Sequence, residues 1–208
     1  MSAARAAAIV GALVGAFGLI LQFWLLYADM TANGASPVEA TWRYFAYFTI
    51  LTNTFVTLVM ASAALNPDSS TGLNSRRVEL MAVTSILFVC ITYNMLLAAR
   101  WDPQGWQKLA DVTVHDVVPI LFAIFWALRP HGGLTWRDAA FAALWPLAYA
   151  VYGLTRGLFD QFYPYFFMDP TTLSYRQIAV NLVGLVAAFM IGALLLLGIS
   201  RALAGRKP

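Results

Sequence analysis

Long apolar stretches alternate with short polar segments along the chain. The six stretches run over Ala4–Tyr27, Tyr44–Leu65, Val78–Ala99, Val112–Leu128, Ala139–Leu154 and Ile178–Leu203. A helix needs about 17–25 mainly apolar residues to cross the hydrocarbon core of a bilayer, and each stretch is near that length. The intervening segments carry Asn, Asp, Gly and Pro pairs that favour turns. The pattern predicts an all-α, polytopic membrane protein in which residues 1–208 form a single domain, a bundle of six transmembrane helices.

The first stretch has two interpretations, a signal peptide or a retained helix. Arg5 followed by an apolar run is typical of a signal peptide. The apolar core here is roughly twenty residues, however, which is longer than the 7–15 of a signal. It also contains Gly11 and Gly15, followed by Gly18, a spacing that lets helices pack closely. We expect a retained helix.

Composition agrees with a membrane protein. The 208 residues are 61% hydrophobic and 11% charged, whereas a soluble domain carries about 25% charged residues. The single cysteine, Cys90, excludes an intramolecular disulfide and a cysteine-based zinc site. The basic residues are scattered among the loops, so the isoelectric point near 9.2 does not indicate nucleic-acid binding.

The distribution of basic residues predicts the orientation. Six crossings place both termini on one side of the membrane. Eight of the thirteen Lys and Arg residues fall on that side: Arg5, Arg76, Arg77, Arg129, Arg137, Arg201, Arg206 and Lys207. Lys and Arg in short loops concentrate on the cytoplasmic side, so we expect both termini to be cytoplasmic.

Polar side chains within the apolar stretches gather at one depth, in the half away from the termini. Such groups are costly in a bilayer and usually face the bundle interior or a wet cavity, so we expect one site in the outer leaflet. The candidates are Thr49, Asn53, Asn94, His115, Asp116, Tyr149, Tyr152, Arg156 and Asn181. Each has a structural alternative: threonine bonds back to its own helix, asparagine joins helices, and Tyr152 and Arg156 anchor the interface.

His115 is the histidine at this depth, because His131 falls in a loop on the side of the termini. Asp111 precedes it by four residues, so the carboxylate can share its helix face and orient the imidazole. Pro119 follows it by four residues and removes the helical donor for the His115 carbonyl. Either the helix kinks beside the site, or Pro119 is one of the prolines that membrane helices tolerate.

A threonine and a histidine together can perform acyl-ester chemistry. A threonine hydroxyl becomes a nucleophile when an adjacent base takes its proton, and His115 is the base available. Asn53, Asn94 or Tyr152 can donate to an oxyanion, while Arg156 can hold a carboxylate or a phosphate. One histidine is too few for a metal site, and no phosphate-binding loop occurs, so we expect neither metal nor cofactor. These residues alone leave an enzyme and a non-enzyme both open.

Two segments resemble a known family. Trp42–Asn53 (WRYFAYFTILTN) and Val114–Leu121 (VHDVVPIL) resemble the second-helix motif and the His-x-x-x-Pro helix of the androgen-induced-gene-one and androgen-dependent TFPI-regulating protein family. The likeness is closer to the prokaryotic six-helix relatives of that family. Trp136–Ala139 and Tyr163–Pro170 are similar to those relatives too, so that the resemblance covers most of the chain in order and spacing.

The animal members of this family are integral membrane threonine hydrolases that cleave esters between a fatty acid and a hydroxy fatty acid. The resemblance implies the same activity here, with the threonine mapping best onto Thr49 and the histidine onto His115. The animal motif has its next polar residue three positions after the threonine, whereas here Thr52 stands at three and Asn53 at four. Thr52 is therefore the second choice. The resemblance also implies a prokaryotic cytoplasmic membrane.

The resulting hypothesis is a hydrolase that acts on a lipid ester, with Thr49 and His115 as catalytic residues. Its partner is a membrane lipid or fatty acid ester, and no nucleic acid is expected. The supporting residues are Asn53, Asn94, Asp111, Tyr152, Arg156 and Asn181. Two alternatives stay open: a lipid-binding or carrier protein that uses the same cavity without a covalent step, and a structural subunit whose polar residues only pack helices.

Overall fold

The computed structural model describes residues 1–205, and all regular elements within that range are helical. Arg206, Lys207 and the end of the expected 1–208 domain lie outside the described residues. The α-helices are α1 (Ala3–Ala32), α2 (Pro37–Tyr44), α3 (Phe48–Leu65), α4 (Arg76–Thr92), α5 (Gly105–Val112), α6 (Val118–Ala127), α7 (Trp136–Ala142), α8 (Leu144–Asp160) and α9 (Tyr175–Ala204). Short 3₁₀ turns are η1 (Gly72–Asn74), η3 (Ala98–Arg100) and η5 (Phe166–Met168), and π-turns are η2 (Tyr93–Leu97) and η4 (Thr113–Val117).

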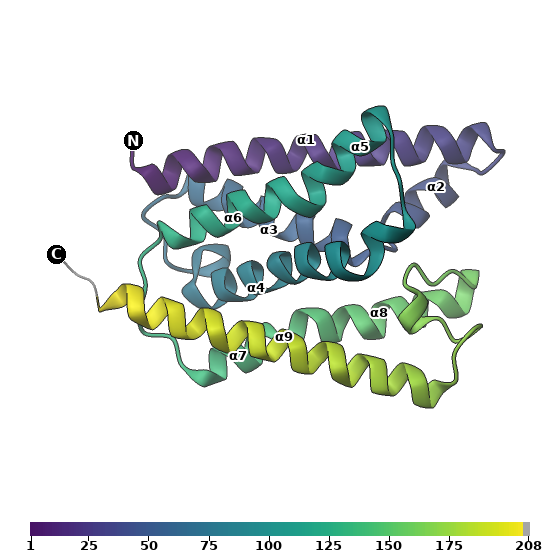
Figure 1. Cartoon of the computed structure of the whole chain (residues 1–208). Helices are drawn as coiled ribbons and strands as arrows, with labels where there is room; N and C mark the ends of the chain where they lie inside the picture. Colours follow the sequence, from purple (N-terminus) through teal and green to yellow (C-terminus); the bar gives the residue numbers. More distant parts are fainter. Residues whose placement is uncertain (206–208) are drawn as a thin grey trace.

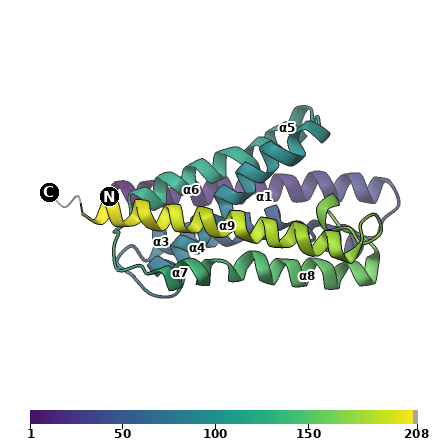
Figure 2. The ribbon, with the colours of Figure 1, turned by 60° about the horizontal axis from the view of Figure 1, so that its bottom comes forward.

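Five helical stretches in residues 1–205 are long and apolar enough to cross a membrane. They are Ala3–Ala32, Phe48–Leu65, Arg76–Arg100, Gly105–Ala127 and Tyr175–Ala204. These match five of the six predicted crossings. The other, predicted over Ala139–Leu154, is divided into α7 and α8 at Ala143. Pro146 explains the division, because it has no N–H to donate to the carbonyl of Ala142. Figure 2 shows α7 and α8 nearly end to end along one side of the bundle.

The second apolar stretch does not form a helix from Tyr44, as predicted, because α2 ends there and α3 begins at Phe48. Two tyrosines account for the interruption. Tyr149 Oη donates to the carbonyl of Ala46 at 2.9 Å, and Tyr152 Oη donates to the carbonyl of Phe45 at 3.0 Å. These carbonyls are thus satisfied outside a helix.

Helix α1 packs closely on its neighbours through small residues. Gly11, Gly15 and Gly18 are all buried. A Cβ on Gly15 would meet the side chain of Thr57 on α3, and a Cβ on Gly18 would meet Thr113 in η4. The close packing predicted from the glycine spacing is therefore confirmed, and α1 forms part of the bundle (Figure 1).

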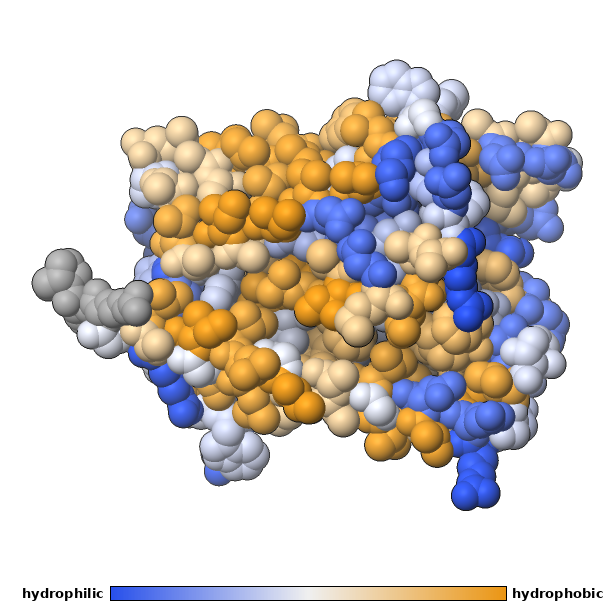
Figure 3. All heavy atoms as spheres, viewed as in Figure 1, coloured by the Kyte–Doolittle hydropathy of each residue, from blue (hydrophilic) through white to orange (hydrophobic). Residues whose placement is uncertain are grey.

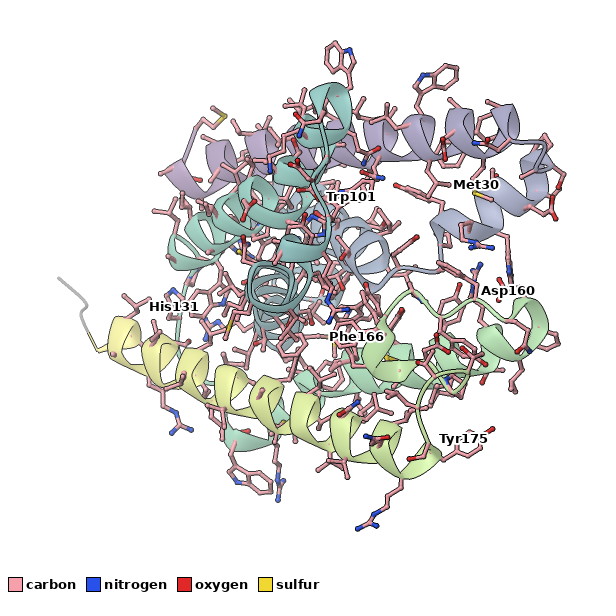
Figure 4. All side chains as sticks on the ribbon, turned by 45° about the vertical axis from the view of Figure 1, so that its right-hand side comes forward. Met30, Trp101, His131, Asp160, Phe166 and Tyr175 are labelled. Carbon is pink, nitrogen blue, oxygen red and sulfur yellow. The ribbon has the colours of Figure 1, made fainter. Side chains whose placement is uncertain are left out.

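The two ends of the bundle are distinct. The N-terminus and the last turn of α9 lie at the same end (Figure 1). In Figure 4, His131 lies toward that end, whereas Met30, Asp160 and Tyr175 lie at the opposite end. His131 is half-buried rather than fully solvated, and its Nδ1 lies 3.2 Å from Ser200 Oγ. The two histidines of the chain thus lie apart.

The outer surface of the bundle is strongly apolar. Figure 3 shows a face dominated by hydrophobic residues along α4, α6 and α9, with hydrophilic residues over α5 and at the ends. Side chains such as Leu13, Ile20 and Val183 are exposed to 67%, 68% and 70%. Apolar exposure on this scale is compatible with an integral membrane protein, whose outer side chains contact the hydrocarbon chains of lipids rather than water.

Candidate functional site

A cavity of about 480 Å³ lies among α1, α3, η2, η4 and the loop that precedes α9. Three of the predicted site residues line it: Thr49, Asp111 and His115. Trp101 and Phe166 also line it and are exposed, so the cavity opens beside them. Figure 4 shows both residues away from the end that carries His131. The structure therefore brings the threonine, the histidine and the aspartate to one place.

His115 is held from two sides. Its Nδ1 lies 3.1 Å from Oδ1 of Asp111 and 3.0 Å from the Asp111 carbonyl oxygen. The ring of Tyr93 stacks on the imidazole, with centroids 3.6 Å apart and planes 6° apart. Tyr93 Oη also donates to the Asp111 carboxylate at 2.7 Å. Two oxygen acceptors at Nδ1 favour a proton on that nitrogen, which leaves Nε2 able to accept one.

Two π-turns shape this part of the site, η2 with Tyr93 and η4 with His115. In η4, a backbone N–H reaches the carbonyl of Thr113 five residues back. Pro119 gives the reason, since it cannot donate to the carbonyl of His115. The helix around His115 is therefore irregular: Pro119 is accompanied by a widened turn at His115, which agrees with a distortion beside the site rather than with an undisturbed helix. Such turns occur often at functional sites, because they shift side chains out of the regular helical register.

Thr49 lies in the first turn of α3. The helix starts at Phe48, and the preceding residue, Tyr47, supplies no side-chain cap. The Thr49 N–H donates to Tyr165 Oη at 3.4 Å. Within residues 1–205, no hydrogen bond joins the Thr49 hydroxyl directly to His115, so the two groups share a cavity without touching.

Thr52 is placed differently from Thr49. It is fully buried, and its Oγ1 accepts a hydrogen bond from Trp145 Nε1 at 3.0 Å. It does not line this cavity, nor a smaller cavity that lies between α4, α8 and α9. Of the two threonines, Thr49 is the one that a ligand in the cavity would meet.

Two predicted site residues, Asn53 and Asn181, do not line the cavity and instead donate hydrogen bonds to backbone carbonyls. Asn53 is fully buried, and its Nδ2 donates to the carbonyls of Thr49 at 2.9 Å and Val114 at 3.0 Å. It therefore ties α3 to the turn that carries His115, and both amide protons are used. Asn181 Nδ2 donates to the carbonyl of Phe167 at 3.0 Å and holds the loop before α9.

Arg156 and Tyr152 form a separate cluster outside the cavity. Arg156 is 3% exposed, its Nη2 lies 3.3 Å from Asp160 Oδ2, and its guanidinium lies 4.1 Å from the ring centroid of Trp42. Arg156 Nη1 donates to Tyr152 Oη at 3.2 Å. The guanidinium thus faces a carboxylate and aromatic rings of the protein itself, so it is not positioned to hold a ligand in the cavity.

Asn94 points outward. It is exposed, and its Nδ2 donates to Asp116 Oδ1 at 2.9 Å. Asp116 is adjacent to His115 in sequence but does not line the cavity. The pair lies on a different side of η4 from the pair formed by His115 and Asp111. The predicted convergence of polar residues therefore applies to Thr49, Asp111 and His115 and not to Asn94.

Tyr165 is a cavity residue that sequence reasoning missed. It is buried in the loop between α8 and α9, and burial raises the pKa of its hydroxyl to about 12. The phenol therefore stays neutral at pH 7. Since Oη already accepts from the Thr49 N–H, its own proton is available to a group in the cavity. Tyr165 belongs to a segment, Tyr163–Pro170, that drew attention for its resemblance, but nothing in its sequence indicated contact with α3.

Other polar groups complete the wall nearest α5, which projects from the bundle (Figure 2). Gln107 Nε2 donates to Gln22 Oε1 at 3.0 Å and links α5 to α1. Arg100 lines the cavity with its guanidinium 4.1 Å from the ring centroid of Phe166. Among residues 1–205, no group of three His, Cys, Asp or Glu side chains is arranged to hold a metal ion. This side of the cavity is polar and carries a positive charge.

A smaller cavity of about 70 Å³, which we call the crevice, adjoins the first between α4, α8 and α9. The two cavities share Thr49, Tyr93, Leu97 and Tyr165. Thr49 therefore lies at the boundary between a cavity with charged lining residues and an apolar crevice.

No family model, curated protein or solved structure matches the chain. No relative therefore assigns a function to the chain, and the geometry of the site is the basis for a proposal.

Proposed function

We propose that this protein is an integral membrane hydrolase that cleaves a lipid ester, with Thr49 as nucleophile and His115 as base. One observation carries the proposal: Thr49 and His115 line the same cavity, and Asp111 Oδ1 lies 3.1 Å from Nδ1 of His115. A nucleophile, a base and an acid that orients the base are the parts of a hydrolytic triad. The resemblance to the androgen-induced-gene-one family supports the same roles.

The chemistry follows in two steps. Thr49 Oγ1 attacks the ester carbonyl carbon and gives its proton to Nε2 of His115, while the carbonyl electron pair moves onto oxygen. The intermediate collapses, the bond from carbonyl carbon to the alcohol oxygen breaks, and the imidazolium protonates the leaving alkoxide. Water then gives a proton to His115 and attacks the acyl-Thr49 ester. This releases the fatty acid and restores the threonine hydroxyl.

Stabilisation of the oxyanion comes from the start of α3 and from Tyr165. The first N–H groups of a helix have no helical acceptor and carry a partial positive charge. In α3 these groups lie in the turn that holds Thr49, where Tyr165 Oη accepts from the Thr49 N–H and the Tyr47 carbonyl accepts from the Leu51 N–H, so the turn contributes mainly its partial positive charge. The neutral Tyr165 hydroxyl adds a further donor in the same place. Fixed donors aimed at a developing charge are worth about 10²–10³ in rate each. These groups take the role first expected of Asn53, Asn94 or Tyr152.

In the membrane, we infer six crossings, the five continuous ones and a sixth formed by the divided α7–α8 segment. Both termini then lie on the cytoplasmic side of a prokaryotic inner membrane, as the basic residues indicate. The cavity lies toward the other end, and hence in the outer leaflet. Lateral entry beside Trp101 and Phe166 suits a lipid, since aromatic residues favour the interface.

The direct test is to label the purified protein with a fluorophosphonate probe and to locate the adduct by mass spectrometry. We expect labelling at Thr49 in the wild type and none in Thr49→Ala or His115→Ala. Thr54→Ala is the matched control, because its hydroxyl bonds back to the carbonyl of Ile50 at 2.8 Å and it lines neither cavity. Full ester turnover in both Thr49→Ala and His115→Ala would overturn the proposal.

The alternative is a lipid-binding or carrier protein that uses the same cavity without a covalent step. The lack of a direct hydrogen bond between the Thr49 hydroxyl and His115 among the described residues favours it. In that case a fluorescent fatty acid binds equally well to wild type and Thr49→Ala, and no ester in a broad panel is turned over.

A further inference from the structure

The crevice is placed and lined differently from the larger cavity. Its walls are mainly apolar side chains of α4, α8 and α9, with a few threonine and tyrosine side chains among them. No charged residue lines it within the described part of the chain. The larger cavity, in contrast, has Arg100, Asp111 and His115 among its lining residues. An ester bound at Thr49 thus faces a space with charged groups on one side and a space without them on the other.

The inner limit of the crevice is set by an aromatic contact. Phe88 of α4 lines the crevice, and its ring lies 5.5 Å from that of Phe189 on α9 in an edge-to-face arrangement. Leu182, Leu185 and Val186 form the α9 wall, and their i, i+3, i+4 spacing puts them on one face of the helix. Val186 is the last of them along α9, one turn before Phe189, so it lies nearest this limit.

We propose that the crevice binds the hydrocarbon chain of the acyl group that is transferred to Thr49, and that Val186 limits the chain length. This inference rests on the proposed hydrolase function. An ester carbonyl has two substituents, and only the acyl chain stays attached to Thr49 in the intermediate. An apolar space that begins at Thr49 suits that chain, while the alcohol half and its polar groups occupy the larger cavity. Each buried methylene strengthens binding by roughly fourfold.

The test compares hydrolysis of p-nitrophenyl acetate with that of p-nitrophenyl butanoate, whose short chain matches a crevice of about 70 Å³. The wild type should prefer butanoate in kcat/KM. Val186→Phe fills the crevice and should lower kcat/KM for butanoate by about tenfold, through loss of two buried methylenes, while acetate hydrolysis stays within about twofold. Val183→Phe, at a position 70% exposed on the same helix, should leave both values unchanged. An unchanged butanoate-to-acetate ratio in folded Val186→Phe would overturn the proposal.

A second measurement separates this proposal from the hydrolase assignment. Wild-type protein is irradiated with a fatty acid that carries a diazirine near its methyl end, and the crosslinked peptide is identified. We expect crosslinks to α9 around Leu185 and their loss in Val186→Phe. If neither ester is hydrolysed, the hydrolase assignment fails while the crosslink still decides whether the crevice takes an alkyl chain. Crosslinks confined to the lipid-facing side of α9 would show that the crevice does not bind the alkyl chain.

Discussion

The ring of Tyr93 lies parallel to the imidazole of His115, at 3.6 Å between centroids, and the Tyr93 hydroxyl bonds to the same aspartate that holds the imidazole. Tyr93 comes from η2 and His115 from η4, so one residue couples two π-turns. A base fixed by both a flat contact and a shared carboxylate has little freedom to rotate. The two π-turns thus place Tyr93 against His115, and this contact fixes the orientation of the proposed base.

Replacing Tyr93 separates these two contacts. Tyr93→Phe keeps the ring on His115 but removes the hydrogen bond to Asp111, and a bond to a charged group contributes about 1.5–3 kcal/mol. We expect kcat/KM to fall by roughly tenfold to a hundredfold and the thermal unfolding temperature to fall by several degrees, since about 1 kcal/mol corresponds to about 2–4 °C in a chain of this size. Tyr93→Leu, which also removes the stack, should lose more activity. Equal activity of Tyr93→Phe and wild type would show that the hydroxyl does not act on His115.

The role of the Asp111 carboxylate in orienting His115 can be tested by comparing its replacement with that of Asp116. Asp111→Asn should lower kcat by about 10²–10⁴, because an amide can present the wrong hydrogen-bonding partner to Nδ1. Asp116→Asn is the matched control, since Asp116 bonds to Asn94 and does not line the cavity. Ester hydrolysis by both purified variants gives the comparison. A similar loss in the two variants would mean that the effect is structural.

Alkaline pH should destabilise the protein through Tyr165. Burial raises its pKa to about 12, above the ordinary value of about 10. The neutral hydroxyl therefore contributes stability that is fully present below pH 10 and is lost as the pH rises from 10 towards 12. Between pH 9 and 11.5, the unfolding temperature of Tyr165→Phe should fall less steeply than that of the wild type. Tyr175→Phe, at a position 80% exposed, should follow the wild type.

Close packing of α1 on α3 should make Gly15 intolerant of a methyl group. Gly15→Ala places a Cβ against the side chain of Thr57 and should cost about 1–3 kcal/mol of stability through overpacking. Gly184→Ala on α9 is the control, because its Cβ would meet no atom within 4 Å, and it should change stability by less than about 0.5 kcal/mol. Thermal unfolding in detergent measures both. Rescue of Gly15→Ala by Thr57→Ala would identify the contact.

The predictable part of this molecule follows from length and local spacing. Continuous apolar stretches indicated the five helices that are long and apolar enough to cross a membrane, and a four-residue separation placed Asp111 beside His115. Thr49 and His115 shared a depth, and the structure puts them in one cavity. The shared depth of these two residues in the sequence thus agrees with a shared cavity, although Thr49 was expected within a continuous helix and lies in the first turn of one.

The remainder depends on contacts between distant segments and on irregular turns. Arg156 was expected to bind a ligand, but its guanidinium contacts Asp160 and Trp42 instead, and a pairing with Trp42 cannot be read from helix periodicity. Asn94 lies within the π-turn η2, where a period of 3.6 residues does not assign faces. Tyr165 reaches Thr49 from a loop more than a hundred residues away in sequence. Each of these relationships appears only once the chain is folded.

The break at Ala143 affects how the chain enters a bilayer. Pro146 leaves the carbonyl of Ala142 without its helical donor, and an exposed carbonyl in hydrocarbon costs several kcal/mol. The adjoining α7 packs against α4 and α9, and Ala139 and Ala142 are fully buried there. Shelter from these helices lowers that cost. In the proposed six-crossing arrangement, we therefore expect the α7–α8 segment to integrate less readily by itself than the five continuous helices.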